Sequence, residues 1–331
     1  MSRENSPTND ASAHSLDRVF SNRIEQCSVG VLKGSIMAWS KDATSVRREW
    51  ATPVIWFGPA LVLLFAVTLY PTAVVVWLSL SRTRYYDVLG WAGVGNFVSV
   101  LTSAPFWDLT VNSLIYMIGS LAIVLPVGLF AALALQTMKR GASSFRVLLL
   151  LPWTLSMAVV GCFWLWLLNP SYGPISYSMK SIGLTPGLML GDPDIALLLL
   201  IVVTAWWSFP YVMVLMSAAL QSIPGELYEA IDMDGGGFWP RFRHVVWPHV
   251  DATLGSTALA LSIMYLTLIT LILVLTGGGP IGATSTWSFE VFISAFRSVD
   301  VSPSAVISII VLVVNLLLGF VYLRLTGRVS G

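Results

Sequence analysis

Residues 195–220 read IALLLLIVVTAWWSFPYVMVLMSAAL, and residues 221–248 continue as QSIPGELYEAIDMDGGGFWPRFRHVVWP. The first stretch contains no Asp, Glu, Lys, Arg or His. At 1.5 Å per residue in a helix, it is longer than the hydrocarbon core of a bilayer, which is about 30 Å thick. The second stretch mixes acids, glycines and prolines. The pair therefore predicts a membrane-spanning helix that leads into a structured polar loop.

Further apolar runs of similar length occur elsewhere in the chain. They cover residues 53–80, 109–138, 145–168, 253–276 and 303–325, with no charge near the middle of any of them. Lipid cannot hydrogen-bond backbone N–H and C=O groups, so each run is expected to be a helix. None of the runs alternates polar and apolar residues as a strand of a membrane barrel does. The sequence predicts an all-α membrane protein with six transmembrane helices.

The overall composition agrees with a membrane protein. The 331 residues are 56% hydrophobic and 11% charged, with a formal net charge of +1. Soluble domains carry about 25% charged residues, and disordered chains combine low hydrophobicity with high net charge. A nucleic-acid partner would normally require a basic excess. The composition therefore excludes those classes and leaves lipid as the surroundings of most of the chain.

Charge divides the chain into two regions. Residues 1–50 hold seven cations and six anions, which is 13 of the 35 charged residues. They show no sustained helical period and no secretory signal pattern. We expect residues 1–50 to be a disordered cytoplasmic tail and residues 51–331 to form the transmembrane domain. A start at Met37 is an open alternative.

The distribution of Lys and Arg predicts the orientation, because cytoplasmic loops carry an excess of both. With the N-terminus inside, the short inside segments hold seven cations: Lys139, Arg140, Arg146, Arg241, Arg243, Arg324 and Arg328. The outside segments then hold four: Arg82, Arg84, Lys180 and Arg297. We therefore expect a multi-pass protein with both termini in the cytoplasm.

The loop after residue 220 predicts a short amphipathic helix over residues 222–235. Ser222 and Pro224 are typical of a helix start, and Glu226 suits the positive end of the helix dipole. Gly235 suits a left-handed C-terminal residue. Spacing predicts one apolar side formed by Leu227, Ala230 and Ile231, and one acidic side formed by Glu226, Glu229 and Asp232.

Such a helix suits a groove on a cytoplasmic partner. The alternative is an interfacial helix lying on lipid. The acidic side argues against that alternative, because the inner leaflet is negatively charged.

The same loop resembles the EAA loop of permeases from binding-protein-dependent ABC importers. In the family pattern, three residues separate Glu-Ala-Ala from a Gly, and nine more separate that Gly from Ile-x-Leu-Pro. The matching residues here are Glu229, Ala230, Gly235 and Pro248. Ile231, Val245 and Trp247 replace the second Ala, the Ile and the Leu. The resemblance implies that the helix couples to an ATPase subunit through Glu226, Glu229, Ala230, Asp232, Gly235 and Pro248.

Other segments are similar to sugar and glycerol-phosphate permeases of the maltose-transporter type. They are residues 151–152, 169–174, 275–280, 285–286 and 289–296. This resemblance implies import of a carbohydrate across a bacterial or archaeal inner membrane. It also implies a second homologous permease, two ATPase subunits and an extracytoplasmic solute-binding protein. Glycerol-phosphate, or another small polar solute such as a polyamine, is the alternative cargo.

The chain is not expected to be an enzyme. A P-loop needs Gly-Lys-Ser/Thr at a helix start, and the Gly277–Gly279 run lacks that sequence, so it predicts a tight turn. ATP and Mg²⁺ therefore belong to a separate ATPase, and no cofactor or metal site is expected on this chain. An intramembrane lipid-modifying enzyme is the rival class. It is disfavoured because Asp108, Asp192, Asp194, Glu290 and Asp300 have no His beside them in the sequence.

A polar and aromatic stripe marks a candidate substrate path. Thr204, Ser208 and Tyr211 lie at i, i+4 and i+7, with Trp207 beside them. Aromatic faces and neutral hydrogen-bonding groups are typical of sugar sites. By the family resemblance, Tyr265 in the 253–276 run is expected to face the same path. Ordinary interhelical packing is the alternative for all five residues.

Overall fold

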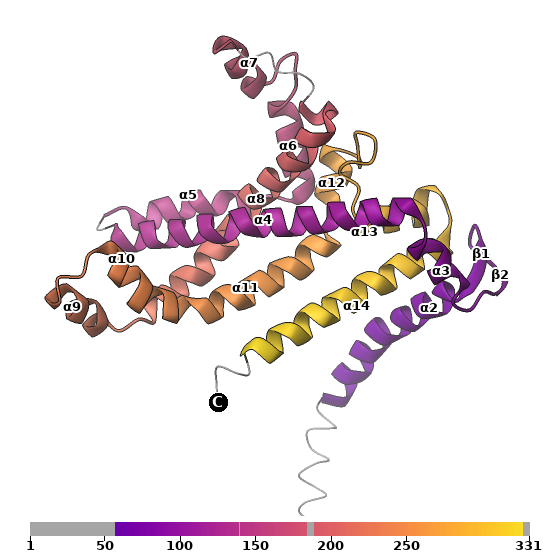
Figure 1. Cartoon of the computed structure of the whole chain (residues 1–331), viewed down its shortest axis with the longest axis horizontal. Coiled ribbons are helices and arrows are strands. Elements are labelled where there is room, and N and C mark those ends of the chain that lie inside the picture. Colours follow the sequence, from indigo (N-terminus) through magenta and orange to yellow (C-terminus); the bar gives the residue numbers. More distant parts are fainter. Residues whose placement is uncertain (1–56, 139, 184–188, 327–331) are drawn as a thin grey trace, which may run out of the picture. The chain divides into compact units, whose positions relative to one another are not determined.

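A computed structural model describes residues 57–138, 140–183 and 189–326 (Figure 1). The chain divides into two compact units, Met1–Thr72 and Ala73–Gly331. The predictions for residues 1–50 and for a start at Met37 lie outside the described residues, as do Lys139 and Arg328.

Within the described residues, five helices are long and apolar enough to cross a membrane. They are Phe57–Ser79, Ala104–Thr137, Pro193–Gln221, Phe238–Thr267 and Val301–Arg324. A bent pair, Ala142–Thr154 and Met157–Leu167, supplies a sixth crossing if it counts as one span. The predicted all-α membrane fold is confirmed, although one of its predicted spans is not a continuous helix.

The elements follow in chain order, with π-helical and 3₁₀ segments labelled η. They are η1 (Phe65–Leu69), α2 (Tyr70–Ser79), β1 (Ser81–Arg84), β2 (Asp87–Trp91), α3 (Gly95–Leu101), α4 (Ala104–Thr137), α5 (Ala142–Thr154), α6 (Met157–Leu167), α7 (Pro174–Ser181), η2 (Met189–Gly191), α8 (Pro193–Gln221), α9 (Gly225–Met233), α10 (Phe238–Arg241), η3 (Phe242–Val246), α11 (Trp247–Thr267), α12 (Thr270–Leu275), α13 (Trp287–Phe292), η4 (Ile293–Arg297) and α14 (Val301–Thr326).

The prediction of a single helix over residues 145–168 is wrong, because two helices cover this run. The chain turns by 95° between α5 and α6. Pro152 has no N–H to continue the helical ladder, Leu155 is extended, and Ser156 caps α6 by accepting a hydrogen bond from Val159 N. The carbonyl freed at Leu155 accepts a hydrogen bond from Trp207 Nε1 over 3.1 Å. A side chain of α8 therefore satisfies a backbone group that lipid could not.

The predicted bounds of the fifth span, 253–276, are also wrong. Its helix begins at Phe238 and ends at Thr267, and α12 follows as a separate short helix. The polar residues before Thr253 are helical, and Pro248 lies just after the π-helical segment η3, in the first turn of α11, where a proline is tolerated. Asp251 consequently lies inside this helix, with an exposed side chain.

The core of the Ala73–Gly331 unit lies where α4 and α8 pack along one another and against α11. Gly128 of α4 faces Val212 of α8 so closely that a Cβ on Gly128 would overlap that side chain. Close approach of helices through small residues is typical of membrane proteins. In the same way, Gly161 of α6 admits Val274 of α12, because a Cβ there would lie 2.7 Å from Val274 Cγ1.

A short hairpin is fastened to the start of α14. Strands β1 and β2 pair antiparallel, and Ser302 Oγ donates a hydrogen bond to Ser81 O over 2.7 Å. The Gly277–Gly279 run forms the tight turn predicted for it. Gly277 and Gly278 have φ values of +61° and +82°, which glycine adopts without strain.

Candidate functional site

The short helix predicted over residues 222–235 is present as α9. It begins after Pro224 and carries Glu226 in its first turn. Its end is closed by two hydrogen bonds, from Gly235 N to Asp232 O over 3.1 Å and from Gly236 N to Ile231 O over 2.9 Å. Gly235 has a φ of +72°. This is a Schellman ending, and it stops the helix at the glycine that the sequence singled out.

One side of α9 faces the rest of the chain. Tyr228 and Ile231 are half-buried against the core, whereas Leu227, Ala230 and Met233 are exposed. Of the three residues on the predicted apolar side, only Ile231 is half-buried against the chain, whereas Leu227 and Ala230 are exposed. Met233 is 89% exposed.

The acidic residues of α9 divide in the same way. Asp232 forms an ion pair with Arg241, the last residue of α10. Glu226 and Glu229 are exposed and have no ion-pair partner within residues 57–326 as far as these are described. The outward side of α9 therefore combines two uncompensated carboxylates with exposed apolar side chains. Pro248 does not lie on α9 but in the first turn of α11.

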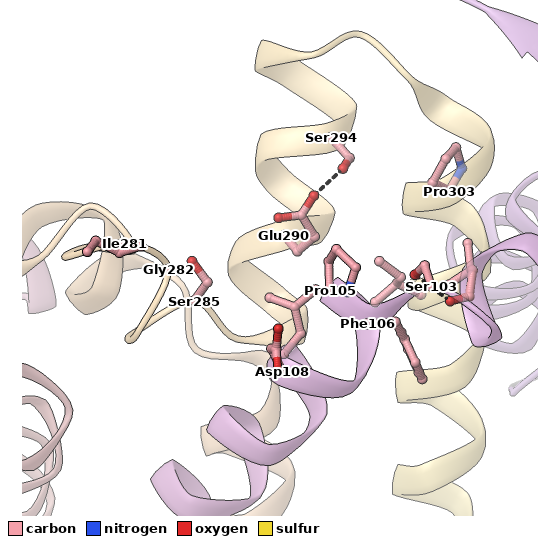
Figure 2. A pocket seen from close by; sticks show the side chains of 13 residues that line it. Ser103, Pro105, Phe106, Asp108, Ile281, Gly282, Ser285, Glu290, Ser294 and Pro303 are labelled. Atoms are coloured by element: carbon pink, nitrogen blue, oxygen red, sulfur yellow. Dashed lines mark hydrogen bonds between the residues drawn. The ribbon is translucent and has the colours of Figure 1, made fainter. Parts of the chain in front are cut away.

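A cavity of about 380 Å³ lies at the N-terminal end of α4 (Figure 2). Its wall includes Asp108 of α4 and Glu290 of α13, and Glu290 Oε1 accepts a hydrogen bond from Ser294 Oγ over 2.7 Å. The residues lining this cavity include no His, Lys or Cys. The two acids share this wall with three serines, Ser103, Ser285 and Ser294.

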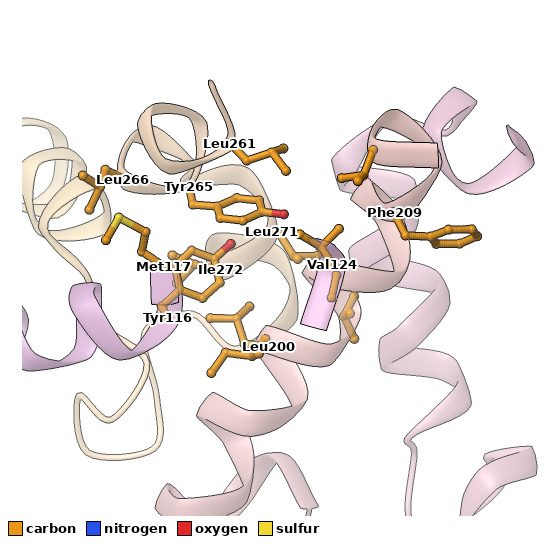
Figure 3. Close-up of a cluster of buried hydrophobic side chains, with 14 of the residues drawn as sticks. Tyr116, Met117, Val124, Leu200, Phe209, Leu261, Tyr265, Leu266, Leu271 and Ile272 are labelled. Carbon is orange, nitrogen blue, oxygen red and sulfur yellow. The ribbon is translucent and has the colours of Figure 1, made fainter. Parts of the chain in front are cut away.

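Three of the predicted substrate residues, Thr204, Ser208 and Tyr265, form a buried network between helices. Figure 3 shows Tyr265 and Tyr116 among the buried side chains of this region. Thr204 Oγ1 donates to Leu200 O over 2.8 Å, and Ser208 Oγ donates to Thr204 O over 2.7 Å. Each hydroxyl has a single proton, so each accepts its second hydrogen bond. Tyr116 OH therefore donates to Thr204 over 3.0 Å, and Tyr265 OH donates to Ser208 over 2.6 Å.

This network joins α4, α8 and α11. Tyr116 and Tyr265 are each 1% exposed, and Thr204 and Ser208 are fully buried. The geometry matches the interhelical packing alternative for Thr204, Ser208 and Tyr265. Sequence reasoning missed Tyr116, for which the available signal was a lone tyrosine in the apolar run 109–138.

The other two predicted residues, Trp207 and Tyr211, belong to an aromatic cluster beside the break between α5 and α6. The ring centroid of Trp153 lies 4.3 Å from that of Trp207 and 5.2 Å from that of Tyr211. All three rings are half-buried. Trp153 was also missed, and its position directly after Pro152 was the available signal. The predicted stripe on α8 thus separates into a buried polar network and a partly accessible aromatic cluster.

Comparison with known proteins identifies the family of the chain. Residues 124–331 match the family described as binding-protein-dependent transport system inner membrane component. The chain is 29% identical over 282 residues to the trehalose/maltose transport system permease protein MalF of Thermococcus litoralis, covering 85% of this chain and 95% of that protein. It is 27% identical over 265 residues to the sn-glycerol-3-phosphate transport system permease protein UgpA of Agrobacterium fabrum, covering 79% and 90%.

Solved structures share the fold. One is a chain of a bacterial alginate ABC transporter in complex with an alginate pentasaccharide-bound periplasmic protein. It has a TM-score of 0.74 and 18% sequence identity, and the match covers 87% of this chain and 97% of that chain.

The family match includes the short helix α9. It also includes α8 and α11, which carry most of the buried network. Membership makes the chain a transport subunit rather than an enzyme. It also implies that the chain works with a solute-binding protein and an ATPase. The protein belongs to the inner membrane components of binding-protein-dependent transport systems, which are the permeases of ABC importers.

Proposed function

We propose that this permease forms one half of a pore that imports a carbohydrate. A second homologous permease supplies the other half, two ATPase subunits bind ATP and Mg²⁺, and a solute-binding protein delivers the solute. In this arrangement the chain carries no cofactor of its own.

The observation that carries the coupling role is the outward side of α9. Within the described residues, Glu226 and Glu229 are exposed and form no ion pair, and Ala230 and Met233 lie between them and the end of the helix. A helix with an apolar strip flanked by carboxylates suits a groove rimmed by basic residues. We assign this groove to the ATPase. Gly235 ends the helix, and Pro248 starts the membrane-spanning part of the next one.

This assignment sets the orientation. ATP is cytoplasmic, so α9 lies on the cytoplasmic side and the hairpin β1–β2 lies on the outer side. Both termini are then cytoplasmic, in agreement with the excess of Lys and Arg on the inner segments. Residues 1–50 are a cytoplasmic tail, and residues 51–331 form the permease domain.

The aromatic cluster favours a neutral carbohydrate as the solute. Trp153, Trp207 and Tyr211 offer partly accessible ring faces, on which the apolar face of a sugar can stack. Helix α8 contains no Lys or Arg, and Arg146 of α5 lies seven residues before Trp153, about 10 Å along the helix axis, so a phosphate group stacked on the rings would lie about two helical turns from it. The relatives include a trehalose/maltose permease and glycerol-phosphate permeases, so carbohydrates and glycerol-phosphate are the two solute classes that we compare.

Uptake by the complete transporter in proteoliposomes tests the solute class. We expect a neutral oligosaccharide, presented with the cognate binding protein, to be imported in an ATP-dependent manner, and glycerol 3-phosphate to be excluded. Import of glycerol 3-phosphate without import of any neutral sugar would refute the carbohydrate assignment and leave the ABC importer assignment intact.

A further inference from the structure

Arg241 joins two turns of α9 to the long helix Phe238–Thr267. Its guanidinium group forms the ion pair with Asp232, and its guanidinium carbon lies 5.6 Å from the centre of the Tyr228 ring. Tyr228 and Asp232 are four residues apart, so they lie on the same side of α9 in adjacent turns. A single side chain thus contacts both turns, through a charge and through a ring face.

Close packing does not hold this side of α9. A cavity of about 310 Å³ lies between α9 and the C-terminal end of α4, lined by Leu133, Gln136, Thr137, Tyr228, Phe242 and Val246, among others. The hydroxyl of Tyr228 and Nε of Arg241 are buried, and neither has a hydrogen-bond partner within the described parts of the chain. Apart from the partial burial of Tyr228 and Ile231, the setting of α9 therefore depends on Arg241 and on the backbone at its two ends.

The rotation of α9 decides what it presents outward. In a helix of 3.6 residues per turn, Glu226, Ala230 and Met233 point within about 40° of the direction opposite Tyr228. Holding Tyr228 against the chain therefore aims these three side chains outward. A rotation of α9 about its own axis would turn them away and would break both contacts of Arg241.

We infer that Arg241 is a positioning residue for energy coupling. It fixes the rotation of α9 on the membrane-spanning helix Phe238–Thr267, so that a movement of the docked ATPase is passed to that helix instead of being lost as rotation of α9. This inference rests on the proposed docking of α9 to the ATPase.

The ion pair between Arg241 and Asp232 is expected to position α9 without adding much to the stability of the fold. The side chains of Arg241 and Asp232 are 41% and 53% exposed. Exposed ion pairs contribute little to folding, because water and salt screen them. Removal of the pair should therefore lower coupling while leaving the amount of folded transporter and its melting temperature unchanged.

The test uses the complete transporter in proteoliposomes and measures solute imported per ATP hydrolysed. We expect Arg241→Gln to lower this ratio by about threefold or more, and Asp232→Asn to lower it less, because the ring contact with Tyr228 stays. Arg241→Lys should keep most of the ratio, since lysine retains the charge. Arg243→Gln is the matched control, because Arg243 is exposed two residues further along and forms none of these contacts.

Several outcomes would overturn the inference: a wild-type ratio in Arg241→Gln or in Asp232→Asn, an equal fall in Arg243→Gln, or a melting temperature that falls in proportion to the ratio. Glu229→Lys separates this inference from the proposed docking. If Arg241→Gln couples normally while Glu229→Lys releases the ATPase, only the role of Arg241 is refuted. If Glu229→Lys also retains the ATPase, the docking itself is refuted.

Discussion

Tyr265 of α11 donates its hydroxyl hydrogen bond to Ser208 of α8 across 2.6 Å, in a site where both residues are buried. Both residues match the sugar-site pattern in sequence, yet each satisfies the other inside the protein. The pair forms a hydrogen bond between α8 and α11, and the Tyr116–Thr204 pair forms one between α4 and α8. The polar atoms of this network serve the packing of the three helices.

Tyr265→Phe and Tyr116→Phe should therefore affect stability more than transport. Each removes one interhelical hydrogen bond, which is worth about 0.5–1 kcal/mol in a membrane protein. Thermal unfolding of the purified complex should shift down by a few degrees, and the KM for uptake should stay within about twofold of wild type. A raised KM at unchanged stability would instead indicate that these hydroxyls reach the solute.

Trp153→Ala should impair uptake by weakening solute binding at the aromatic cluster. Loss of one stacking face costs on the order of 1 kcal/mol, so the KM should rise about fivefold. Trp166→Ala is the control, because Trp166 is exposed on α6 and its ring contact is with Phe163, outside the cluster. Uptake kinetics in proteoliposomes distinguish the two, and equal KM values in both variants would contradict the stacking role.

Glu229→Lys should uncouple the permease from its ATPase. A lysine there would face the basic groove proposed for the docking site, so repulsion would replace attraction. We expect the ATPase to be lost on co-purification while the permease still inserts into the membrane. Asp87→Lys, an exposed charge reversal in the hairpin, should retain the ATPase. Retention of the ATPase by both variants would argue against the docking of α9.

Gly128→Ala tests the close approach of α4 and α8. The added methyl group would overlap the side chain of Val212 and lie 3.1 Å from the backbone nitrogen of Met213, so the helices must separate. Overpacking of this kind costs about 1–3 kcal/mol. Gly319→Ala on α14 is the control, because a methyl group there meets no atom within 4 Å. Denaturation in detergent should show a loss for Gly128→Ala alone, and equal stability of the two variants would contradict the packing.

The class of the protein and the position of its short helix follow from local sequence alone. Uncharged runs longer than a bilayer must be helices because lipid offers no hydrogen bonds, and this argument needs no neighbours. The start of α9 near Pro224 and its end at Gly235 also follow from local backbone chemistry. Family resemblance in the same loop then indicated an ABC importer permease.

Which side of each helix makes contacts, by contrast, depends on how the helices pack together. Spacing groups Leu227, Ala230 and Ile231 together, but the attachment of α9 through Tyr228 and Arg241 turns Ile231 inward. The break at Leu155 is stabilised by Trp207, a residue 52 positions away. Hydroxyl groups that a single helix presents as free find partners on other helices, as Ser208 does with Tyr265. Such outcomes depend on contacts between distant segments, which local periodicity does not encode.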